Sequence, residues 1–296
     1  MKNFKMKKLL AIILSISLLA LAGCSPGGDN NSEGLSTLER VQKEGKIVVG
    51  FANEKPYAYK TSDGEVTGMS VEVARAIFKE LGINEVEGKV TEFGSLIPGL
   101  KAGRFDVVTA GMYITPKRAE QVAFADPEYR VGQGLAVSKG NPHNLHSYQD
   151  IANNPDISVA VMAGGFELDY LKASGVKESQ IQVVNDIPSC ISALESGRVD
   201  ATTMTDITLQ SALQTADQSK LQLVMDFEQP IIEGQSVIAH GAAAFNQADT
   251  DFVAAYNAEL QKLKESGKLL EILKKFGFSE QNLPADITTE QIIAES

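Results

Sequence analysis

Arg118 is the residue whose position in the chain most clearly indicates a chemical role. It follows Thr115 and Pro116, a pair typical of the N-cap and first position of a helix, and the apolar run Phe105–Ala110 before them predicts a buried strand. Arg118 would therefore lie in the first helical turn, where the helix dipole disfavours a cation and free backbone N–H groups attract anions. A cation placed there requires an anionic partner, either a neighbouring carboxylate or the carboxylate of a ligand. A surface arginine that packs its stem on the protein is an equally simple alternative.

Other polar and aromatic side chains follow the ends of further predicted strands. In open α/β sheets, ligands bind outside the carboxyl ends of the strands, so these loops form the candidate site. Together they would offer one cation, two carboxylates, backbone N–H groups and aromatic rings, a set that suits a small zwitterion. The candidate ligand-binding residues are Glu54, Tyr57, Phe93, Gly111, Tyr113, Thr115, Arg118, Gly164, Gly165, Phe166 and Asp206. No metal-ligand spacing accompanies them, so we expect neither a metal nor a cofactor.

Strands alternate with helices along most of the chain. The apolar run Lys46–Phe51 predicts a strand, and Ser70 can cap a helix that ends at Gly82. Ser95 can cap a second helix, which Gly103 closes. This alternation predicts the doubly wound α/β class.

Two segments repeat each other and predict two lobes. Residues 100–109 (LKAGRFDVVT) are echoed by 194–203 (LESGRVDATT), and each pattern indicates a helix end, a Gly C-cap and a buried strand. We expect two doubly wound α/β lobes, joined by crossing strands near Gly134–Ser138 and Gln235–His240, with the site in the cleft between them. The expected bounds are 41–138 with 235–280 for lobe 1, 139–234 for lobe 2, and 281–296 for a mobile tail.

The N-terminal segment predicts secretion. Residues 1–8 hold four lysines and no acid, and the apolar run Leu9–Ala22 is too short for a stable membrane span. This predicts a signal peptide over residues 1–23, followed by Cys24 in a context that resembles the bacterial lipoprotein signal, and a lipidated, flexible tether over residues 24–40. Cleavage would lower the formal net charge from −11 to −15, which argues against nucleic acid or an anionic bilayer surface as a partner. With Cys24 acylated, Cys190 has no disulfide partner and is expected to be a small buried hydrophobe.

The order of these parts resembles the solute-binding proteins of bacterial ABC importers, specifically the family that binds polar amino acids, family 3. The resemblance covers roughly Thr37 to Phe278. Its most specific pieces are residues 96–106 (LIPGLKAGRFD), 110–118 (AGMYITPKR), 122–127 (VAFADP) and 197–201 (GRVDA). It implies a type II periplasmic-binding-protein-like clamp that closes on its ligand by hinge motion.

The same resemblance implies roles and partners. In that family an arginine at the position of Arg118 holds the ligand carboxylate, the backbone around Thr115 helps it, and an acid at the position of Asp206 meets the ligand's amino group. The implied partners are a small zwitterionic ligand, an ABC importer permease and, through the lipid on Cys24 alone, the outer surface of the cell membrane. We expect an extracytoplasmic, lipid-anchored monomer that is not an enzyme.

Position 113 departs from the amino-acid binders, which commonly carry Ser or Thr there. Tyr113 with Tyr57 and Phe93 would form an aromatic box, which suits a delocalised cation through attraction of about 0.5–2 kcal/mol per ring face. This resembles the ectoine/hydroxyectoine-binding branch, in which positions like these, with Glu54 and Arg118, surround the compatible solute. Arg118 would take the carboxylate, while Glu54 and the rings would take the amidinium.

The turn Gly164-Gly165-Phe166 would add backbone donors to the ligand carboxylate as the cleft closes. Polar amino acids and betaines are the next candidate ligands.

Simpler interpretations stay open for several of these residues. The three rings could be ordinary core aromatics, Asp206 could be only the N-cap of a helix over Ile207–Leu213, and Glu54 could be a solvated loop acid. A dehydratase-type enzyme is the main alternative from another class, because Glu54, Arg118 and Asp206 could hold an acid/base pair. The three histidines, however, lie outside the strand-end loops, and no activated Ser or Cys constellation accompanies them.

Overall fold

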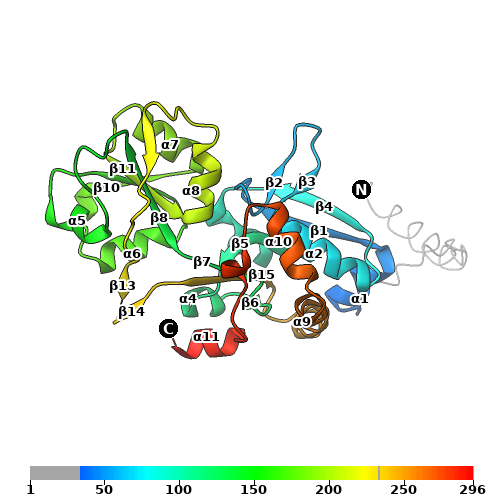
Figure 1. Ribbon diagram of the computed structural model, residues 1–296. Coiled ribbons are helices and arrows are strands. Elements are labelled where there is room, and N and C mark those ends of the chain that lie inside the picture. Colours follow the sequence, from blue (N-terminus) through cyan, green and yellow to red (C-terminus); the bar gives the residue numbers. More distant parts are fainter. Residues whose placement is uncertain (1–33, 233, 296) are drawn as a thin grey trace, which may run out of the picture. The chain divides into compact units, whose positions relative to one another are not determined.

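The computed structural model describes residues 34–232 and 234–295. The predicted signal peptide, the lipidation of Cys24 and the first ten residues of the expected tether lie outside this described part. Ser36–Ser296 forms one compact unit that contains two large β-sheets with helices packed on them (Figure 1). We call the parts built on these sheets lobe 1 and lobe 2.

Lobe 1 is built on a sheet in the order β4-β1-β5-β15-β6, with β7 also paired to β15. β1 is parallel to β4 and β5, whereas β15 is antiparallel to β5, β6 and β7. Its strands are β1 (Lys46–Phe51), β4 (Glu85–Val90), β5 (Val107–Tyr113), β6 (Ala123–Phe124), β7 (Tyr129–Val131) and β15 (Ala239–Phe245), with a hairpin of β2 (Tyr59–Lys60) and β3 (Val66–Thr67). Its helices are α1 (Thr37–Glu44), α2 (Met69–Glu80), α3 (Leu96–Lys101), α4 (Pro116–Ala119), α9 (Thr250–Glu265) and α10 (Lys268–Lys275).

Lobe 2 is built on a sheet in the order β10-β9-β11-β8-β12. β9 is parallel to β10 and β11, whereas β8 is antiparallel to β11 and β12. Its strands are β8 (Gln133–Ser138), β9 (Val159–Met162), β10 (Ile181–Val184), β11 (Ala201–Thr205) and β12 (Leu221–Leu223), followed by a hairpin of β13 (Ile231–Ile232) and β14 (Gln235–Ser236). Its helices are α5 (Tyr148–Asn153), α6 (Glu167–Ala173), α7 (Ile187–Glu195) and α8 (Asp206–Leu213). The fold class predicted from the sequence, two α/β lobes, is confirmed.

The repeated segments occupy equivalent places in the two sheets. Gly103, at φ +65°, lies between α3 and β5, and Gly197, at φ +69°, lies between α7 and β11. Directly before β5, the Asp106 carboxylate accepts a backbone N–H of β1 at 2.9 Å, and directly before β11, the Asp200 carboxylate accepts one from the residue preceding β9 at 2.8 Å. The matching sequence spacing thus reflects the same joint, in which an aspartate ties an incoming strand to its parallel neighbour.

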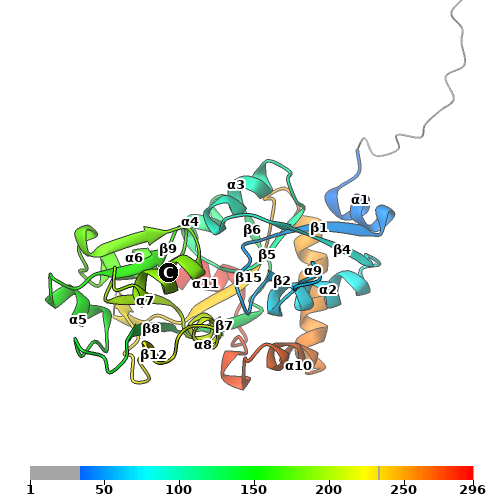
Figure 2. The ribbon, with the colours of Figure 1, turned by 90° about the horizontal axis from the view of Figure 1, so that it is seen from above.

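Two chain segments run between the sheets: β7 leads into β8, and the chain returns from β14 into β15 (Figures 1 and 2). We expected residues up to 138 in lobe 1, but β8 pairs with β11 and β12 of lobe 2, which moves the first crossing to Gly132. The backbone N–H of Gln133, the first residue of β8, donates to the side chain of Gln229, which precedes β13, at 2.7 Å.

Both ends of the described chain contain more structure than the sequence predicted. The expected tether includes Thr37–Arg40, but these residues form part of α1, whose start is fixed by a capping box between Ser36 and Glu39. The expectation of a mobile tail is wrong, because the chain continues through a 3-10 turn at Glu280–Asn282 into α11 (Thr289–Glu295).

The C-terminal helix α11 is tied to lobe 1. The hydroxyl of Thr289 donates to the carbonyl oxygen of Ala125 at 2.6 Å, and its backbone N–H donates to the Asp126 carboxylate at 3.1 Å. Ile292 is only 8% exposed. Two buried residues, Thr289 and Ile292, and these two hydrogen bonds hold the helix, a pattern too sparse to stand out in a polar sequence.

Lobe 1 has an aromatic centre. Phe78 of α2, Phe245 of β15, and Phe252 and Tyr256 of α9 are fully buried, with neighbouring ring centroids 5.0–6.1 Å apart. Such rings bury large areas and prefer tilted or edge-to-face contacts, as here. They fix the helices against the sheet whose strand ends carry half of the site.

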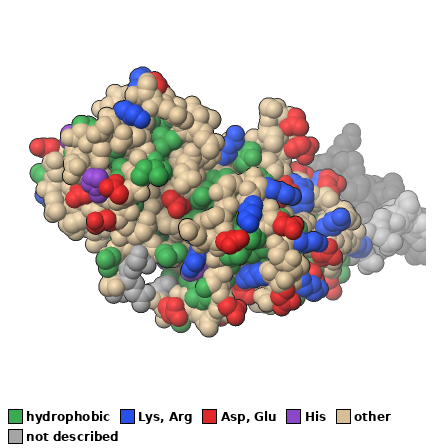
Figure 3. Space-filling model, in the orientation of Figure 1, with side chains coloured by type: hydrophobic (Ala, Val, Ile, Leu, Met, Phe, Trp, Pro, Cys, Tyr) green, Lys and Arg blue, Asp and Glu red, His purple; other side chains and the backbone are tan. Residues whose placement is uncertain are grey.

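The surface of lobe 1 is charged but mixed. On the face shown in Figure 3, Lys and Arg side chains alternate with Asp and Glu side chains over this lobe. Within the described residues, no helix has the length and apolar character needed to cross a membrane.

Candidate ligand-binding site

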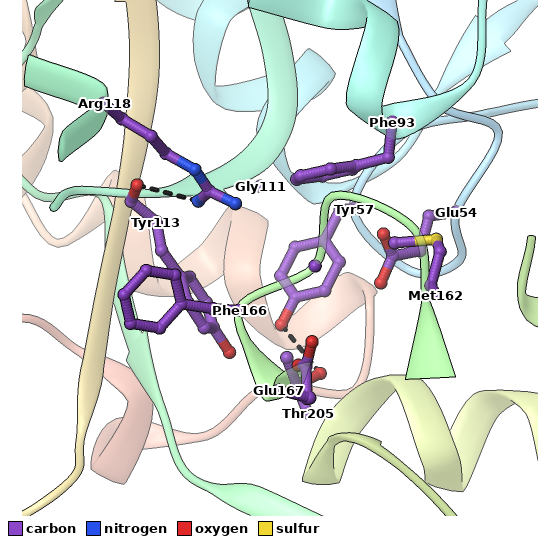
Figure 4. A pocket seen from close by; sticks show the side chains of 11 residues that line it. Glu54, Tyr57, Phe93, Gly111, Tyr113, Arg118, Met162, Phe166, Glu167 and Thr205 are labelled. Atoms are coloured by element: carbon purple, nitrogen blue, oxygen red, sulfur yellow. Dashed lines mark hydrogen bonds between the residues drawn. The ribbon is translucent and has the colours of Figure 1, made fainter. Parts of the chain in front are cut away.

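A cavity of about 30 Å³ lies where strand-end loops of both lobes meet (Figure 4). Lobe 1 supplies six of its lining residues: Glu54, Tyr57, Phe93, Gly111, Tyr113 and Arg118. Lobe 2 supplies the other five: Met162, Gly165, Phe166, Glu167 and Thr205. The space corresponds to about one water molecule, well below the usual size of a ligand pocket, so the two lobes are closed on each other.

Arg118 bridges the two lobes. As predicted, Thr115 caps the short helix α4 and accepts the backbone N–H of Arg118 at 3.2 Å. The guanidinium donates to the carbonyl oxygen of Tyr113 at 3.0 Å and, across the cleft, to the carbonyl oxygen of Gly164 at 2.9 Å. Arg118 thus satisfies two of its five N–H donors with carbonyl groups and keeps its positive charge beside the cavity.

Two rings flank the Arg118 guanidinium. Its central carbon lies 5.4 Å from the ring centroid of Phe93 in lobe 1 and 5.6 Å from that of Phe166 in lobe 2. Both distances fall within the range of cation–π attraction. Phe93, one of the three rings expected around a ligand, and Phe166 therefore already hold a cation of the protein itself.

A chain of hydroxyl groups connects the lobes on the other side of the cavity. The Tyr57 hydroxyl donates to Thr205 Oγ1 at 3.1 Å, Thr205 donates to Thr208 Oγ1 at 2.8 Å, and Thr208 donates to Glu54 Oε1 at 3.0 Å. The chain starts in lobe 1, passes through two residues of lobe 2 and returns to lobe 1. With the Arg118 bridge, it holds the cleft closed through three hydrogen bonds that cross between lobes.

Glu54 forms an acidic pole opposite Arg118. Figure 4 shows the two side chains on opposite sides of Tyr57. Glu54 is only 8% exposed, and burial, with a smaller contribution from the nearby Glu167 carboxylate, raises its pKa to about 8. Its side chain is therefore not the solvated loop acid of the simpler interpretation.

The predicted site set lacks three residues that line the cavity, Met162, Glu167 and Thr205, and Glu167 is the charged one. It opens α6, is only 7% exposed and lines the cavity, although it looked like an ordinary first-turn acid. A carboxylate oxygen of Glu167 turns back over Gly165, where a Cβ would lie 2.6 Å from it. The backbone N–H groups of Phe166 and of Glu167 itself favour the ionised form of this carboxylate. Burial still raises its pKa, because these N–H groups and Arg118 offset only part of the lost hydration. The only signal available was its place directly after Gly164-Gly165-Phe166.

Tyr57 and Tyr113 present different faces to the cavity. The Tyr57 ring packs against Tyr129 and Phe278 with centroids 5.1 and 5.7 Å away, so it belongs both to the core of lobe 1 and to the site. Gly111, at φ +65°, lets this ring approach, because a Cβ at position 111 would lie 2.5 Å from it. The Tyr113 hydroxyl is buried and has no hydrogen-bond partner in the described structure, although Tyr113 lines the cavity. A buried hydroxyl of this kind is available to a ligand.

Three predicted site residues do not line the cavity. Thr115 lies behind Arg118 as a helix cap, and Gly164 contributes through its carbonyl oxygen alone. Asp206 is outside the lining, and its carboxylate accepts the N–H of Ile207 at 2.7 Å. The interpretation of Asp206 as an N-cap is wrong by one residue, because Thr205 caps α8 by accepting the N–H of Thr208.

The turn of lobe 2 directs fewer donors at the cavity than expected. The N–H of Gly165 donates to the carbonyl oxygen of Met162 at 3.1 Å, and the N–H groups of Phe166 and Glu167 favour the ionised form of the Glu167 carboxylate. A ligand carboxylate would have to replace Glu167 to use them.

Catalytic groups other than these acids are not gathered at the cavity. His143 and His146 pair with Asp200 and Asp226 away from it, and His240 is likewise outside its lining. Cys190 is fully buried, and burial raises the pKa of its thiol to about 12, in line with its expected role as a small hydrophobe. Among residues 34–232 and 234–295, no group of three or more His, Cys, Asp or Glu side chains is placed to hold a metal ion.

Comparison with known proteins identifies relatives along almost the whole described chain. Residues 47–280 match the family of bacterial extracellular solute-binding proteins, family 3. The probable amino-acid ABC transporter periplasmic-binding protein y4tE of Sinorhizobium fredii is 36% identical over 263 residues, covering 88% of this chain and 86% of the relative. The L-cystine-binding protein TcyA of Bacillus subtilis is 27% identical over 276 residues, covering 91% of this chain and 97% of that protein.

Two solved structures have the same two-lobed architecture. The crystal structure of EhuB in complex with hydroxyectoine has a TM-score of 0.75 and 35% identity, covering 82% of this chain and 92% of that one. The ancestral amino acid-binding protein AncCDT-1, a precursor of cyclohexadienyl dehydratase, has a TM-score of 0.70 and 29% identity, covering 81% of this chain and 99% of that one.

Proposed function

Because this chain belongs to the bacterial extracellular solute-binding proteins of family 3, we propose that it captures a small zwitterion outside the cell for an ABC importer. The ligand class that the site favours is ectoine or hydroxyectoine. Secretion and a lipid anchor on Cys24 would keep the protein at the outer face of the cell membrane, within reach of the permease. The similarity to a probable amino-acid ABC transporter protein and to hydroxyectoine-bound EhuB supports this proposal.

One observation carries the choice of ligand: a cationic pole and an acidic pole face one cavity that four aromatic rings line. Arg118 forms the first pole, Glu54 the second, and Tyr57, Phe93, Tyr113 and Phe166 supply the rings. Ectoine pairs a carboxylate with a delocalised amidinium, so its carboxylate would meet Arg118 while its ring lies among the aromatic side chains near Glu54. The unpaired Tyr113 hydroxyl supplies one further hydrogen bond.

Ligand entry requires the lobes to open. A ligand of about ten heavy atoms does not fit in about 30 Å³, so the lobes must open first. Opening breaks the three interlobe hydrogen bonds, from Arg118 to Gly164, from Tyr57 to Thr205 and from Thr208 to Glu54. The two segments that connect the lobes would act as the hinge. Once inside, the ligand touches residues of both lobes, and these contacts favour the closed state.

A micromolar Kd corresponds to about −8 kcal/mol, or roughly −0.8 kcal/mol per heavy atom for such a ligand, which is within the bound for small ligands. Charge pairing at two poles and ring contacts on both lobes can therefore account for capture without a covalent bond.

Calorimetry with a small ligand panel tests this function. The purified protein is unfolded in guanidinium chloride, refolded without ligand, and titrated with ectoine, hydroxyectoine, proline betaine and glutamine. We expect micromolar or tighter binding of the ectoines, lost in Arg118→Ala and in Tyr113→Ser. The matched controls Arg104→Ala and Tyr59→Ser alter side chains outside the cavity and should bind like the unmodified protein.

Each other outcome has a defined meaning. If glutamine or proline betaine binds and the ectoines do not, the ligand is a polar amino acid or a betaine. The proposal that an aromatic box selects the ectoines would then be rejected. Conversion of any panel member to a product would favour the dehydratase-type alternative. If none of the four compounds binds, the proposed ligand class is contradicted.

A further inference from the structure

The cavity contains one more acidic group than its single cation can neutralise. Glu54 and Glu167 line it from opposite lobes, both less than a tenth exposed, and Arg118 is the only Lys or Arg among the described residues that line it. An unpaired buried charge is costly, so one of the two carboxyl groups holds a proton in the closed, ligand-free state.

The hydrogen bonds indicate which carboxyl group holds the proton. The Glu167 carboxylate turns back over the start of α6, where the backbone N–H groups of Glu167 and Phe166 favour its ionised form. Gly165 makes this fold-back possible, because a Cβ there would lie 2.6 Å from a carboxylate oxygen of Glu167. Among the described residues, the carboxyl group of Glu54 accepts only the hydroxyl of Thr208. The negative charge therefore belongs to Glu167 and the proton to Glu54.

The other groups that face Glu54 do not change this assignment. Arg118 on α4 favours its ionised form and Glu167 on α6 opposes it, with Glu167 the larger of the two effects. Tyr57 and Tyr129 also interact with Glu54, but burial keeps the pKa of both hydroxyls well above the ordinary value, so they stay neutral. Among the described lining residues, no cation other than Arg118 is therefore present to balance an ionised Glu54.

Building on the proposed capture of a zwitterion, we propose that Glu167 is a specificity-determining residue that keeps Glu54 protonated until a ligand brings a cation to it. Ligands with a positive group then bind with release of the Glu54 proton to solvent. Ligands that carry only a carboxylate bring no cation to Glu54 and add negative charge to a cavity whose single cation, Arg118, is already balanced by Glu167, so the site disfavours them. The charge preference of the site is set by a residue that lies on the lobe opposite Glu54.

The affinity for ectoine as a function of pH tests this proposal. Because binding releases a proton, the affinity rises with pH until the ligand-free Glu54 is itself ionised, near pH 8. The full effect is about 50-fold between pH 6 and pH 8, and we expect at least a tenfold rise. Calorimetry at pH 7 in buffers of different ionisation enthalpy should count close to one released proton.

Three variants assign the proton. Glu54→Gln should abolish the pH dependence, Glu167→Gln should reduce it, and the control Glu128→Gln, which changes a buried acid outside the cavity, should leave it intact. Glu167→Gln should also narrow the difference in affinity between glutamine and glutamate. Binding that is flat with pH, or a slope that survives in Glu54→Gln, would overturn the inference while leaving the proposed function standing. Absence of binding by the whole panel would instead contradict the proposed function.

A measurement without ligand keeps the inference testable on its own. The carboxyl carbon of Glu54, labelled with ¹³C and assigned by its loss in Glu54→Gln, should titrate near pH 8 in the refolded protein. In Glu167→Gln the midpoint should fall by about one pH unit or more, because the neighbouring negative charge is gone. A midpoint below about pH 6 in the unmodified protein, or no change in Glu167→Gln, would contradict the assignment.

Discussion

Replacing Glu128 by glutamine should change how the stability of this protein depends on pH. Glu128 is fully buried in lobe 1 just before β7, and its Oε1 accepts the Tyr256 hydroxyl at 2.7 Å and the N–H of Ala243 at 3.2 Å. Its Oε2 has no hydrogen-bond partner in the described structure. Burial raises its pKa from 4.5 to about 7, offset in part by these hydrogen bonds and by Lys264.

The sign of the effect follows from the raised pKa. Between about pH 4.5 and pH 7 the folded protein keeps the Glu128 proton while the unfolded chain releases it. The free energy of unfolding therefore falls as the pH rises through this range. Linkage with these two values gives a loss of about 2.5 kcal/mol between pH 5 and pH 8, as an order of magnitude. Glutamine has the same size, retains the acceptor for both hydrogen bonds and does not titrate.

Urea unfolding at pH 5 and pH 8 measures this contribution. The chain contains no tryptophan, so far-ultraviolet circular dichroism is the suitable signal. The unfolding free energy of the unmodified protein minus that of Glu128→Gln should fall by about 2.5 kcal/mol from pH 5 to pH 8. The contributions of other titrating groups such as Glu54 cancel in this difference, because both proteins contain them. The exposed Glu120→Gln serves as control and should show no such change. An equal stability difference at both pH values would refute the buried, protonated state of Glu128.

Three further outcomes are expected. Tyr57→Phe removes the interlobe hydrogen bond to Thr205, which is worth about 1 kcal/mol, so the ratio of open to closed molecules should rise about fivefold. X-ray scattering of the ligand-free protein should show this as a larger radius of gyration. An unchanged radius would contradict the closing role of that bond. Gly111→Ala places a Cβ 2.5 Å from the Tyr57 ring, whereas the Cβ of Gly103→Ala, at the same φ of +65°, meets no atom within 4 Å. Only Gly111→Ala should therefore lose ligand binding. Equal losses of binding in the two variants would contradict the close approach of the Tyr57 ring to Gly111. The Cys190 thiol should resist a thiol reagent in native buffer and react in denaturant; fast native reaction would contradict its burial.

The fold was predictable where one local signal fixed one local structure. Thr115 and Pro116 specify a helix start whatever surrounds them, and the repeated Gly and Asp spacing at Gly103 and Gly197 records the same helix-to-strand joint twice. Strand β8 was assigned to the wrong lobe, because hydrophobic periodicity identifies a strand without naming its partners. The docking of α11 depends on contacts of Thr289 with residues about 160 positions away, which no local pattern encodes.

The candidate site was predictable to the level of loops but not of individual roles. Strand-end topology brings Glu54, Arg118 and the rings to one cavity, because parallel strands end at the same sheet edge. It did not indicate that the cavity is lined by Thr205 and not by Asp206, because adjacent residues at a strand end point in different directions. It also missed Glu167, whose carboxylate turns back toward the cavity from the first position of a helix, where acids are common for unrelated reasons.

A crystal structure of the stripped and refolded protein grown with ectoine tests the central claim most directly. The proposed function predicts ectoine between the lobes, its carboxylate within hydrogen-bond distance of the Arg118 guanidinium and its amidinium ring facing Tyr113 on the side of Glu54. Ectoine bound elsewhere, or bound with its carboxylate turned toward Glu54, would contradict the proposed assignment of the two poles.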